Sequence, residues 1–191
     1  MRTYVFIDAS NMFYGGKKSL GWSIDLEKLL KYLQDRFGVS QIYYFGGVEI
    51  HKFPFDYITN ETVPVRDIEE YLSQLIKEKG DEMNDAELKL ISRHYNRVRF
   101  YLKLEKFGYN LILKPVKTRM MMKEKNAFER AIFMSGDGDF LPVLKYLKEN
   151  GKEILVLARG SRTAKEIRQF AGDKFMDFTH NLRSRLEKVD L

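Results

Sequence analysis

The sequence predicts an α/β fold, a three-layer sandwich in which helices cover both faces of a central parallel sheet. Short apolar runs rich in β-branched and aromatic residues alternate with longer segments whose apolar residues recur at helical spacing. This alternation indicates βαβ units around a buried parallel sheet. A length of 191 residues suits one compact domain. We expect a single domain over residues 1–180 and a polar, basic C-terminal tail over residues 181–191.

The expected strands are short and apolar. The first strand, residues 3–7 (TYVFI), leads into an exit loop over residues 8–11. Residues of this kind favour strands that are buried in a core. Further strands are expected at residues 41–45, 109–116, 130–134, 153–157 and 174–178.

The expected helices separate these strands. Asp25 in the first turn and Gly38 after the last turn define a helix over residues 25–37. Pro142 fits the first turn of a helix over residues 141–150, because the missing N–H costs little there. The other helices are expected at residues 67–79, 81–106 and 163–170, and residues 48–66 are expected to be irregular.

The composition limits the chemistry that this protein can perform. The absence of cysteine excludes disulfides, thiolate zinc sites and cysteine nucleophiles. The three histidines lie far apart in the sequence, so a metal site would have to rest on oxygen ligands. Oxygen ligands favour Mg²⁺ or Mn²⁺ over zinc.

Charge and hydropathy indicate the type of partner. The net charge of +6 is compatible with a polyanion, although many basic proteins bind no nucleic acid. The N-terminal apolar run is too short for a signal peptide, and no stretch approaches the roughly 18 apolar residues of a membrane span. We therefore expect a cytoplasmic protein without a membrane partner, and formation of a homo-oligomer stays open.

Carboxylates follow two of the expected strands. Asp8 comes directly after the first strand, and Asp137 and Asp139 follow the fourth in the sequence SGDGDF. Ligands of open parallel sheets bind beyond the carboxyl ends of the strands. Clustered carboxylates repel one another unless a cation neutralises them, and Mg²⁺ accepts one or two carboxylates while keeping water and phosphate ligands. The pattern predicts a metal site for phosphodiester cleavage, with Asn11 and Ser135 as neutral neighbours.

Each of these aspartates also has a purely structural interpretation. An aspartate after a strand often caps the following helix, which alone would explain Asp8 or Asp139. The segment GDGD on its own could be a turn. The same feature at two strand ends favours the functional interpretation.

Two segments, FIDASN and FMSGDGDFLPVLKYLKENGKEILVL, resemble the NYN domain group (LabA-like, DUF88) of the PIN-like nuclease superfamily. The resemblance covers most of residues 1–180. It implies a parallel sheet of order 3-2-1-4-5 and a divalent-metal ribonuclease site. Matching residues imply that Asp8, Asp137 and Asp139 are catalytic or metal-binding, with Asn11 and Ser135 adjoining them. A weaker match implies that Ser161 or Thr163 faces the same cleft.

The sequence departs from this family between the third and fourth strands. The family carries a lysine-rich turn and another acidic residue there, whereas this sequence reads KTRMMMKEKNAFERAIF, with only Glu124 and Glu129 as acids. Residues 118–129 would also have to cross roughly 14 Å, and a parallel crossover usually needs a dozen or more residues. Either the element has been lost, or a segment is missing from the sequence. The well-kept flanking motifs favour the second explanation.

Basic residues offer further candidate contacts to RNA. Residues 89–106 carry cations at helical spacing, which could follow a phosphate backbone or could form a solvated helix face. Four lysines and arginines near the expected site are the weaker candidates for nucleic-acid binding: Lys17, Lys18, Lys117 and Arg119.

The leading hypothesis is therefore a ribonuclease that depends on Mg²⁺ or Mn²⁺. The alternative is an RNA-binding or regulatory module that has the same fold but little catalytic activity. A haloacid-dehalogenase-like phosphatase would need a second aspartate where Ser10 stands, so it has little support.

Overall fold

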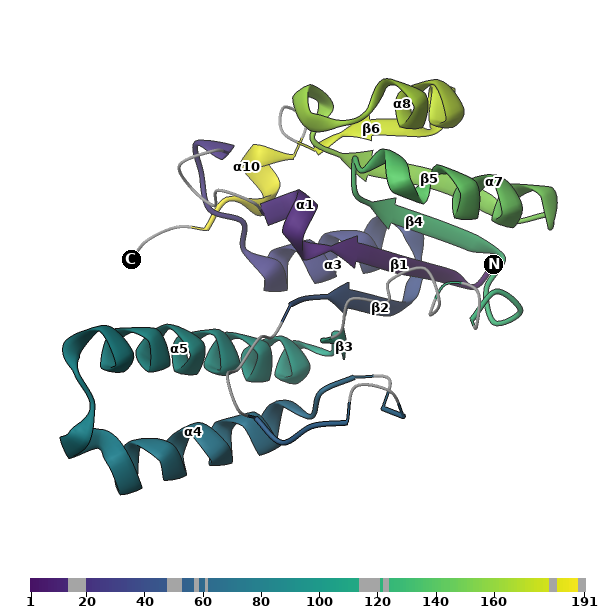
Figure 1. The fold of residues 1–191 in the computed structure, drawn as a ribbon. Coiled ribbons are helices and arrows are strands. Elements are labelled where there is room, and N and C mark those ends of the chain that lie inside the picture. Colours follow the sequence, from purple (N-terminus) through teal and green to yellow (C-terminus); the bar gives the residue numbers. More distant parts are fainter. Residues whose placement is uncertain are drawn as a thin grey trace.

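The computed structural model describes residues 1–13, 20–47, 53–56, 59–60, 62–113, 121, 124–178 and 182–188. It confirms the predicted three-layer α/β fold, with helices on both faces of a central sheet (Figure 1). The strands lie in the order β3-β2-β1-β4-β5-β6, and every neighbouring pair is parallel. The expected order of five strands is thus confirmed, and a sixth strand extends it.

All six predicted strands are present in this sheet. Their bounds are β1 (Thr3–Asp8), β2 (Val39–Phe45), β3 (Asn110–Ile112), β4 (Arg130–Met134), β5 (Glu153–Ala158) and β6 (Phe175–Asp177). β1 lies between β2 and β4, with Ile7 beside both Tyr44 and Met134. β1 and β4, the two strands whose ends are followed by aspartates, are therefore neighbours, as the order 3-2-1-4-5 requires.

The helices also follow the predicted pattern, with shifts of a few residues at their ends. The helices are α1 (Ala9–Phe13), α3 (Leu26–Phe37), α4 (Val65–Lys79), α5 (Asp85–Phe107), α7 (Leu141–Glu149), α8 (Lys165–Ala171) and α10 (Arg183–Leu186). Short 3-10 turns are η1 (Gly80–Glu82), η2 (Gly138–Phe140), η3 (Gly160–Arg162) and η4 (Gly172–Lys174). Two of the described helices were not expected: α1 begins at Ala9, where the sequence suggested an exit loop, and α10 lies in the expected polar tail.

Alternating residues of β1 feed two separate cores. Val5 and Ile7 face a core that includes Leu29 and Leu33 of α3, whereas Phe6 faces the core under α7 and α8. Because a strand points successive side chains to opposite faces, an apolar strand such as β1 is buried on both sides. The central position of β1 fixes where its last residue, Asp8, emerges from the sheet.

The structure describes only part of the connection from β3 to β4. Residues 114–120 and 122–123 lie outside the described residues, so the lost element and the missing segment both stay open as explanations. Phe128, only 1% exposed, closes the crossover by packing its ring 5.6 Å from that of Phe6. The backbone N–H groups of Glu129 and Arg130 both donate to the carbonyl oxygen of Arg2. Burial of one aromatic side chain thus anchors a crossover that looked too short.

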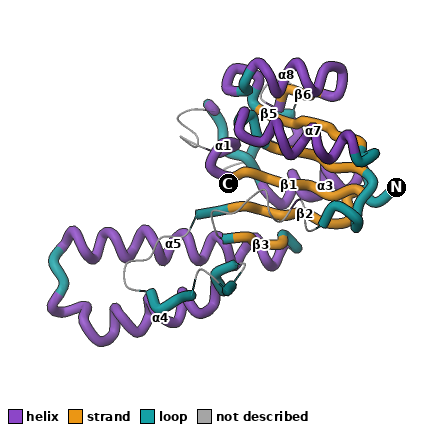
Figure 2. The backbone as a smooth tube through the Cα atoms, turned by 45° about the vertical axis from the view of Figure 1, so that its right-hand side comes forward, coloured by secondary structure: helices purple, strands orange, loops and turns teal. Residues whose placement is uncertain are grey.

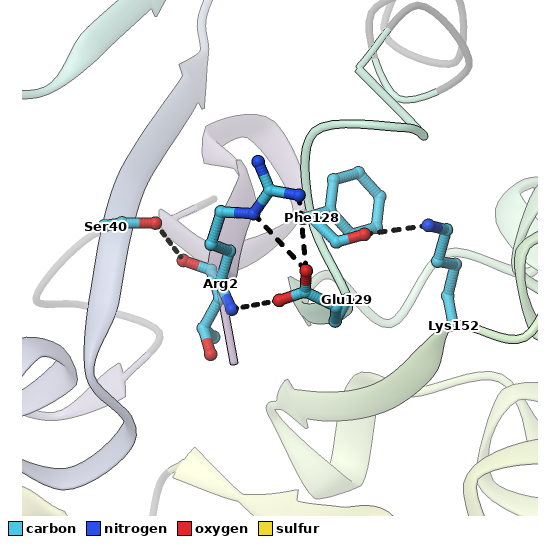
Figure 3. Close-up of polar contacts among 6 residues, drawn as sticks. Arg2, Ser40, Phe128, Glu129 and Lys152 are labelled. Carbon is cyan, nitrogen blue, oxygen red and sulfur yellow. Dashed lines mark hydrogen bonds and ion pairs between the residues drawn. The ribbon is translucent and has the colours of Figure 1, made fainter.

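Glu129 is held at the amino edge of the sheet, as Figure 3 shows. Its carboxylate accepts hydrogen bonds from the backbone N–H and the guanidinium of Arg2, and these bonds lower the pKa of Glu129. Beside it, Lys152 Nζ donates to the carbonyl oxygen of Phe128 at 2.8 Å. Asp8 lies at the opposite, carboxyl edge of the sheet, so Glu129 cannot replace the family's missing acidic residue.

The C-terminal segment contributes to the core. The sequence placed it in a polar tail, but Leu182 and Leu186 are buried in the core around α3. The Asp25 N–H donates to the carbonyl oxygen of Leu186 at 2.8 Å. No helix within the described ranges is long and apolar enough to cross a membrane.

A half-buried ion pair at Glu153 makes the stability of the fold depend on pH. Glu153 accepts from Arg130 Nε at 2.6 Å and from Lys174 Nζ at 3.2 Å, and these two hydrogen bonds lower its pKa. A lowered folded-state pKa stabilises the fold above the unfolded value of about 4.3, and the gain is lost as the pH falls through the folded value. Glu153→Gln should therefore cost about 1 kcal/mol at pH 7 and less at acid pH, measured by urea unfolding.

The control for this prediction is Glu149→Gln, because Glu149 is exposed and has no ion pair within the part of the chain that the structure describes. It should unfold like the parent at both pH values. An equal deficit of Glu153→Gln at pH 7 and at acid pH would contradict the assignment of the effect to this carboxylate.

Candidate functional site

The carboxyl ends of β1 and β4 lie side by side and hold the candidate site. Ile7 and Met134 are paired in the sheet, so the next residues, Asp8 and Ser135, leave it at the same edge. Ser135 Oγ donates to Asp8 Oδ2 at 3.2 Å, and both residues are buried. The exits of the two strands are thus joined directly by side chains.

Asp8 also organises the start of α1. Its Oδ1 accepts from Ser10 Oγ at 2.6 Å and from the backbone N–H groups of Ser10 and Asn11 at 3.2 and 3.4 Å. These bonds explain why a helix begins directly after β1, because a carboxylate that accepts from such N–H groups caps a helix. Capping does not explain the bond from Ser135, which comes from a different strand.

Ser135 and Asn11 connect this helix to the turn after β4. Ser135 Oγ donates to Asp8 and accepts from the backbone N–H of Asp137 at 3.2 Å, so one hydroxyl links two acidic residues. Asn11 Oδ1 accepts from the Gly136 N–H at 2.8 Å. Both neutral residues that the sequence placed beside the site therefore hold its two halves together.

The other two predicted aspartates differ in position. Asp137 is half-buried, and its Oδ1 accepts from the Asp139 N–H at 3.1 Å at the start of η2. Asp139 is exposed. The structure thus joins Asp8 and Asp137 through Ser135 and leaves Asp139 farther toward solvent.

The turn after β4 packs against the segment after β5. A Cβ added at Gly136 would lie 2.7 Å from the Cα of Thr163, and the Ala164 N–H donates to the Gly136 carbonyl oxygen at 2.9 Å. Glycine is required here because no side chain has room, not because of its backbone angles. Thr163 is buried and donates to the carbonyl oxygen of Arg159, whereas Ser161 is exposed.

The sequence analysis did not identify two charged residues that lie near this edge. A Cβ at Gly138 would overlap Glu166 Oε1, which places the carboxylate of Glu166 beside the acidic turn. Arg159, at the end of β5, is 3% exposed, and burial, followed by the charge of Arg162, lowers the pKa of its guanidinium. Neither residue belongs to a motif, so only a three-dimensional arrangement could reveal them.

The donor atoms at this edge fit a hard cation. Asp8, Asp137, Ser135 and Asn11 present only oxygen acceptors and an amide, which suits Mg²⁺ or Mn²⁺ better than zinc. Two carboxylates are enough for Mg²⁺, which keeps several waters. Over the described residues, no group of three or more histidine, cysteine, aspartate or glutamate side chains is arranged to hold a metal. The fit is therefore to a pair of carboxylates.

The weaker candidates for nucleic-acid contact, Lys17, Lys18, Lys117 and Arg119, lie outside the described residues.

The chain is similar to known proteins in sequence and in fold. The NYN domain family model matches residues 92–179. The low amplitude and bright protein LabA of Synechococcus elongatus is 25% identical over 191 residues, which cover 99% of this chain and 89% of LabA. A crystal structure of a protein of unknown function from Vibrio parahaemolyticus has a TM-score of 0.61 at 13% identity, covering 97% of this chain and 95% of that one. That last likeness concerns the fold alone.

Proposed function

We propose that the chain, whose residues 92–179 match the NYN domain family model, is a ribonuclease dependent on Mg²⁺ or Mn²⁺. It would hydrolyse RNA phosphodiester bonds at the edge where β1 and β4 end. Asp8, Asp137 and Asp139 are the proposed catalytic and metal-binding residues. We also propose a cytoplasmic location, where cellular RNA would be within reach of the site.

One observation carries this proposal: the Ser135 hydroxyl links Asp8 Oδ2 to the Asp137 backbone. This contact brings acidic residues from two strands to one edge, although 129 positions separate them in the sequence. A site that only capped two helices would need no bond between the caps. The arrangement supports a shared ligand at the carboxyl ends of neighbouring parallel strands, where such folds bind ligands.

The side chains have distinct proposed tasks. Asp8 and Asp137 would hold the cation, and Ser135 and Asn11 would keep the two carboxylates at a fixed separation. A bound divalent ion lowers the pKa of water and offsets the negative charge that develops during phosphodiester cleavage. Asp139, the exposed acid of the turn, would orient water or the leaving strand at the rim.

Chelation of metal tests the proposal directly. We expect single-stranded RNA to be cleaved in Mn²⁺ or Mg²⁺ and to stay intact in EDTA, with recovery when metal is restored in excess. The measurement is product formation on denaturing gels, using Asp137→Asn purified in the same way to detect contaminating ribonuclease. Equal cleavage by this variant, or cleavage that persists in EDTA, would overturn the metal-dependent mechanism.

A second candidate is an RNA-binding module without turnover. The absence of a three-carboxylate group from the described residues favours it, as does the departure from the family's acidic pattern between β3 and β4. It predicts salt-sensitive RNA binding with no product in Mn²⁺. The same assay therefore separates the two candidates.

A further inference from the structure

The helical hairpin of α4 and α5 extends past the sheet on the side where β1 ends (Figures 1 and 2). Tyr101 marks the level of the edge, because its hydroxyl donates to the carbonyl oxygen of Gly47 at 2.9 Å, just beyond β2. At a rise of 1.5 Å per residue, residues 85–100 extend roughly 24 Å farther. We call these residues the α5 arm.

The arm and the turn that follows it along α5 carry an unbalanced positive charge. Between residues 88 and 104 there are five cations and no acidic residue. The five are exposed: Lys89, Arg93, Arg97, Arg99 and Lys103. Within the described part of the chain, none has a carboxylate partner at ion-pair distance. Since the described residues pair none of this charge with a carboxylate, it is available to an anionic ligand.

The basic row begins near the acidic edge. Arg97 lies close enough to Tyr44 and Tyr101 to oppose the rise in their pKa that burial causes, and Asp8 adds to the rise at Tyr44. The charges of Asp8 and Arg97 therefore both act on Tyr44. From Arg97, Arg93 and Lys89 follow at intervals of four residues, which place them along one side of the helix.

An aromatic ring accompanies these cations. Phe100 is 39% exposed, although its ring lies 6.3 Å from that of Tyr44 and 5.8 Å from that of Tyr101. It precedes Lys103 and follows Arg97 by three residues each, so it shares a side of α5 with both. A partly exposed ring between cations is the combination that binds single-stranded nucleic acid by stacking and charge.

We propose that the α5 arm binds the single-stranded part of an RNA that runs from the acidic edge along α5. Arg97, Arg93 and Lys89 would contact successive phosphates, and Phe100 would stack on an unpaired base. Single-stranded RNA is the occupant because bases in a duplex do not offer their faces to such a ring. This inference rests on the proposed function, since it gives that site its substrate path.

A second copy of the chain fits this surface less well. A twofold contact would bring the same five cations of both molecules together, because such an interface uses the same patch twice. The exposed apolar residues Ile76 and Leu90, at 41% and 49%, nevertheless make self-association the competing outcome.

The test measures binding of the full chain to oligouridine RNA in EDTA by fluorescence anisotropy over a range of salt. Arg93→Gln combined with Arg97→Gln should weaken binding about tenfold and reduce the salt slope by about 1.4, at 0.7 per lost phosphate contact. The control combines Lys31→Gln with Lys145→Gln, an equal charge change at exposed residues on α3 and α7. The control should bind like the parent.

Stacking is tested with Phe100→Leu, which keeps apolar bulk on α5 and removes the ring. We expect at least a fivefold loss of affinity with an unchanged salt slope. Circular dichroism melting checks that the variant is folded.

Three results would overturn the proposal that the α5 arm binds RNA. Equal weakening by both double variants would reduce the effect to total charge, and unchanged binding by the arm variant would remove the arm from the path. Concentration-dependent dimers that Leu90→Ser abolishes, with RNA binding unaffected, would assign the surface to self-association. Binding is measured without metal, so it is independent of cleavage. If the arm variant loses binding although the parent chain never cleaves RNA, the arm proposal stands and only the ribonuclease proposal is refuted.

Discussion

Asp8→Asn is expected to reduce metal-dependent RNA cleavage at least about 100-fold while the protein stays folded. The substitution keeps the shape of the side chain and removes its negative charge. One amide oxygen can still accept from the Ser10 and Asn11 N–H groups, so α1 remains capped. The Ser135 hydroxyl can turn to accept from the new amide. Cleavage measured beside a thermal melt therefore separates the charge of Asp8 from its structural bonds.

Asp173→Asn is the matched control, since Asp173 is an exposed aspartate in η4. It should cleave RNA like the parent. Cleavage by Asp8→Asn at the parental rate would show that Asp8 only caps α1. A large loss of melting temperature would instead assign the lost activity to the fold, and Asp137→Asn would then decide the matter, because Asp137 is only half-buried.

The parts of the fold that could be predicted are those with a local physical signature. Residues 4–7 and 131–134 of two central strands are apolar, because both faces of the sheet are covered. Asp25 and Gly38 mark the ends of α3 by a side-chain cap and by a left-handed residue with φ of 62°. Such signals depend on a few neighbouring residues, so one sequence is enough to recognise them.

The parts that could not be predicted depend on distant contacts. Glu166 lies beside Gly138 only because the segment after β5 packs against the turn after β4. The crossover to β4, which looked too short from the sequence, ends on a contact between the rings of Phe128 and Phe6. The arm's projection follows from unequal lengths: α5 has 23 residues, whereas β3 has three in the part of the chain that the structure describes, so α5 extends past it.

Gly136→Ala should be the most disruptive single-methyl change at the site. The new Cβ would lie 2.7 Å from the Cα and 2.8 Å from the Oγ1 of Thr163, and the first of these atoms is backbone that cannot rotate away. Overpacking of this kind typically costs 1–3 kcal/mol. The turn that carries Asp137 must shift, and a displacement of about 1 Å at a catalytic group can cost roughly 100-fold in rate. Urea unfolding and RNA cleavage would measure the two effects.

Gly47→Ala provides the comparison, because nothing lies within 4 Å of its added Cβ. Its stability and cleavage should match those of the parent. Parental stability in Gly136→Ala would contradict the close packing of the two turns. A stability loss of the expected size with full cleavage would mean that the turn can move without affecting the reaction, and Asp137 would then have no place in the site. Loss of both would tie the rate to the position of this turn, since the methyl group removes no polar atom from the site.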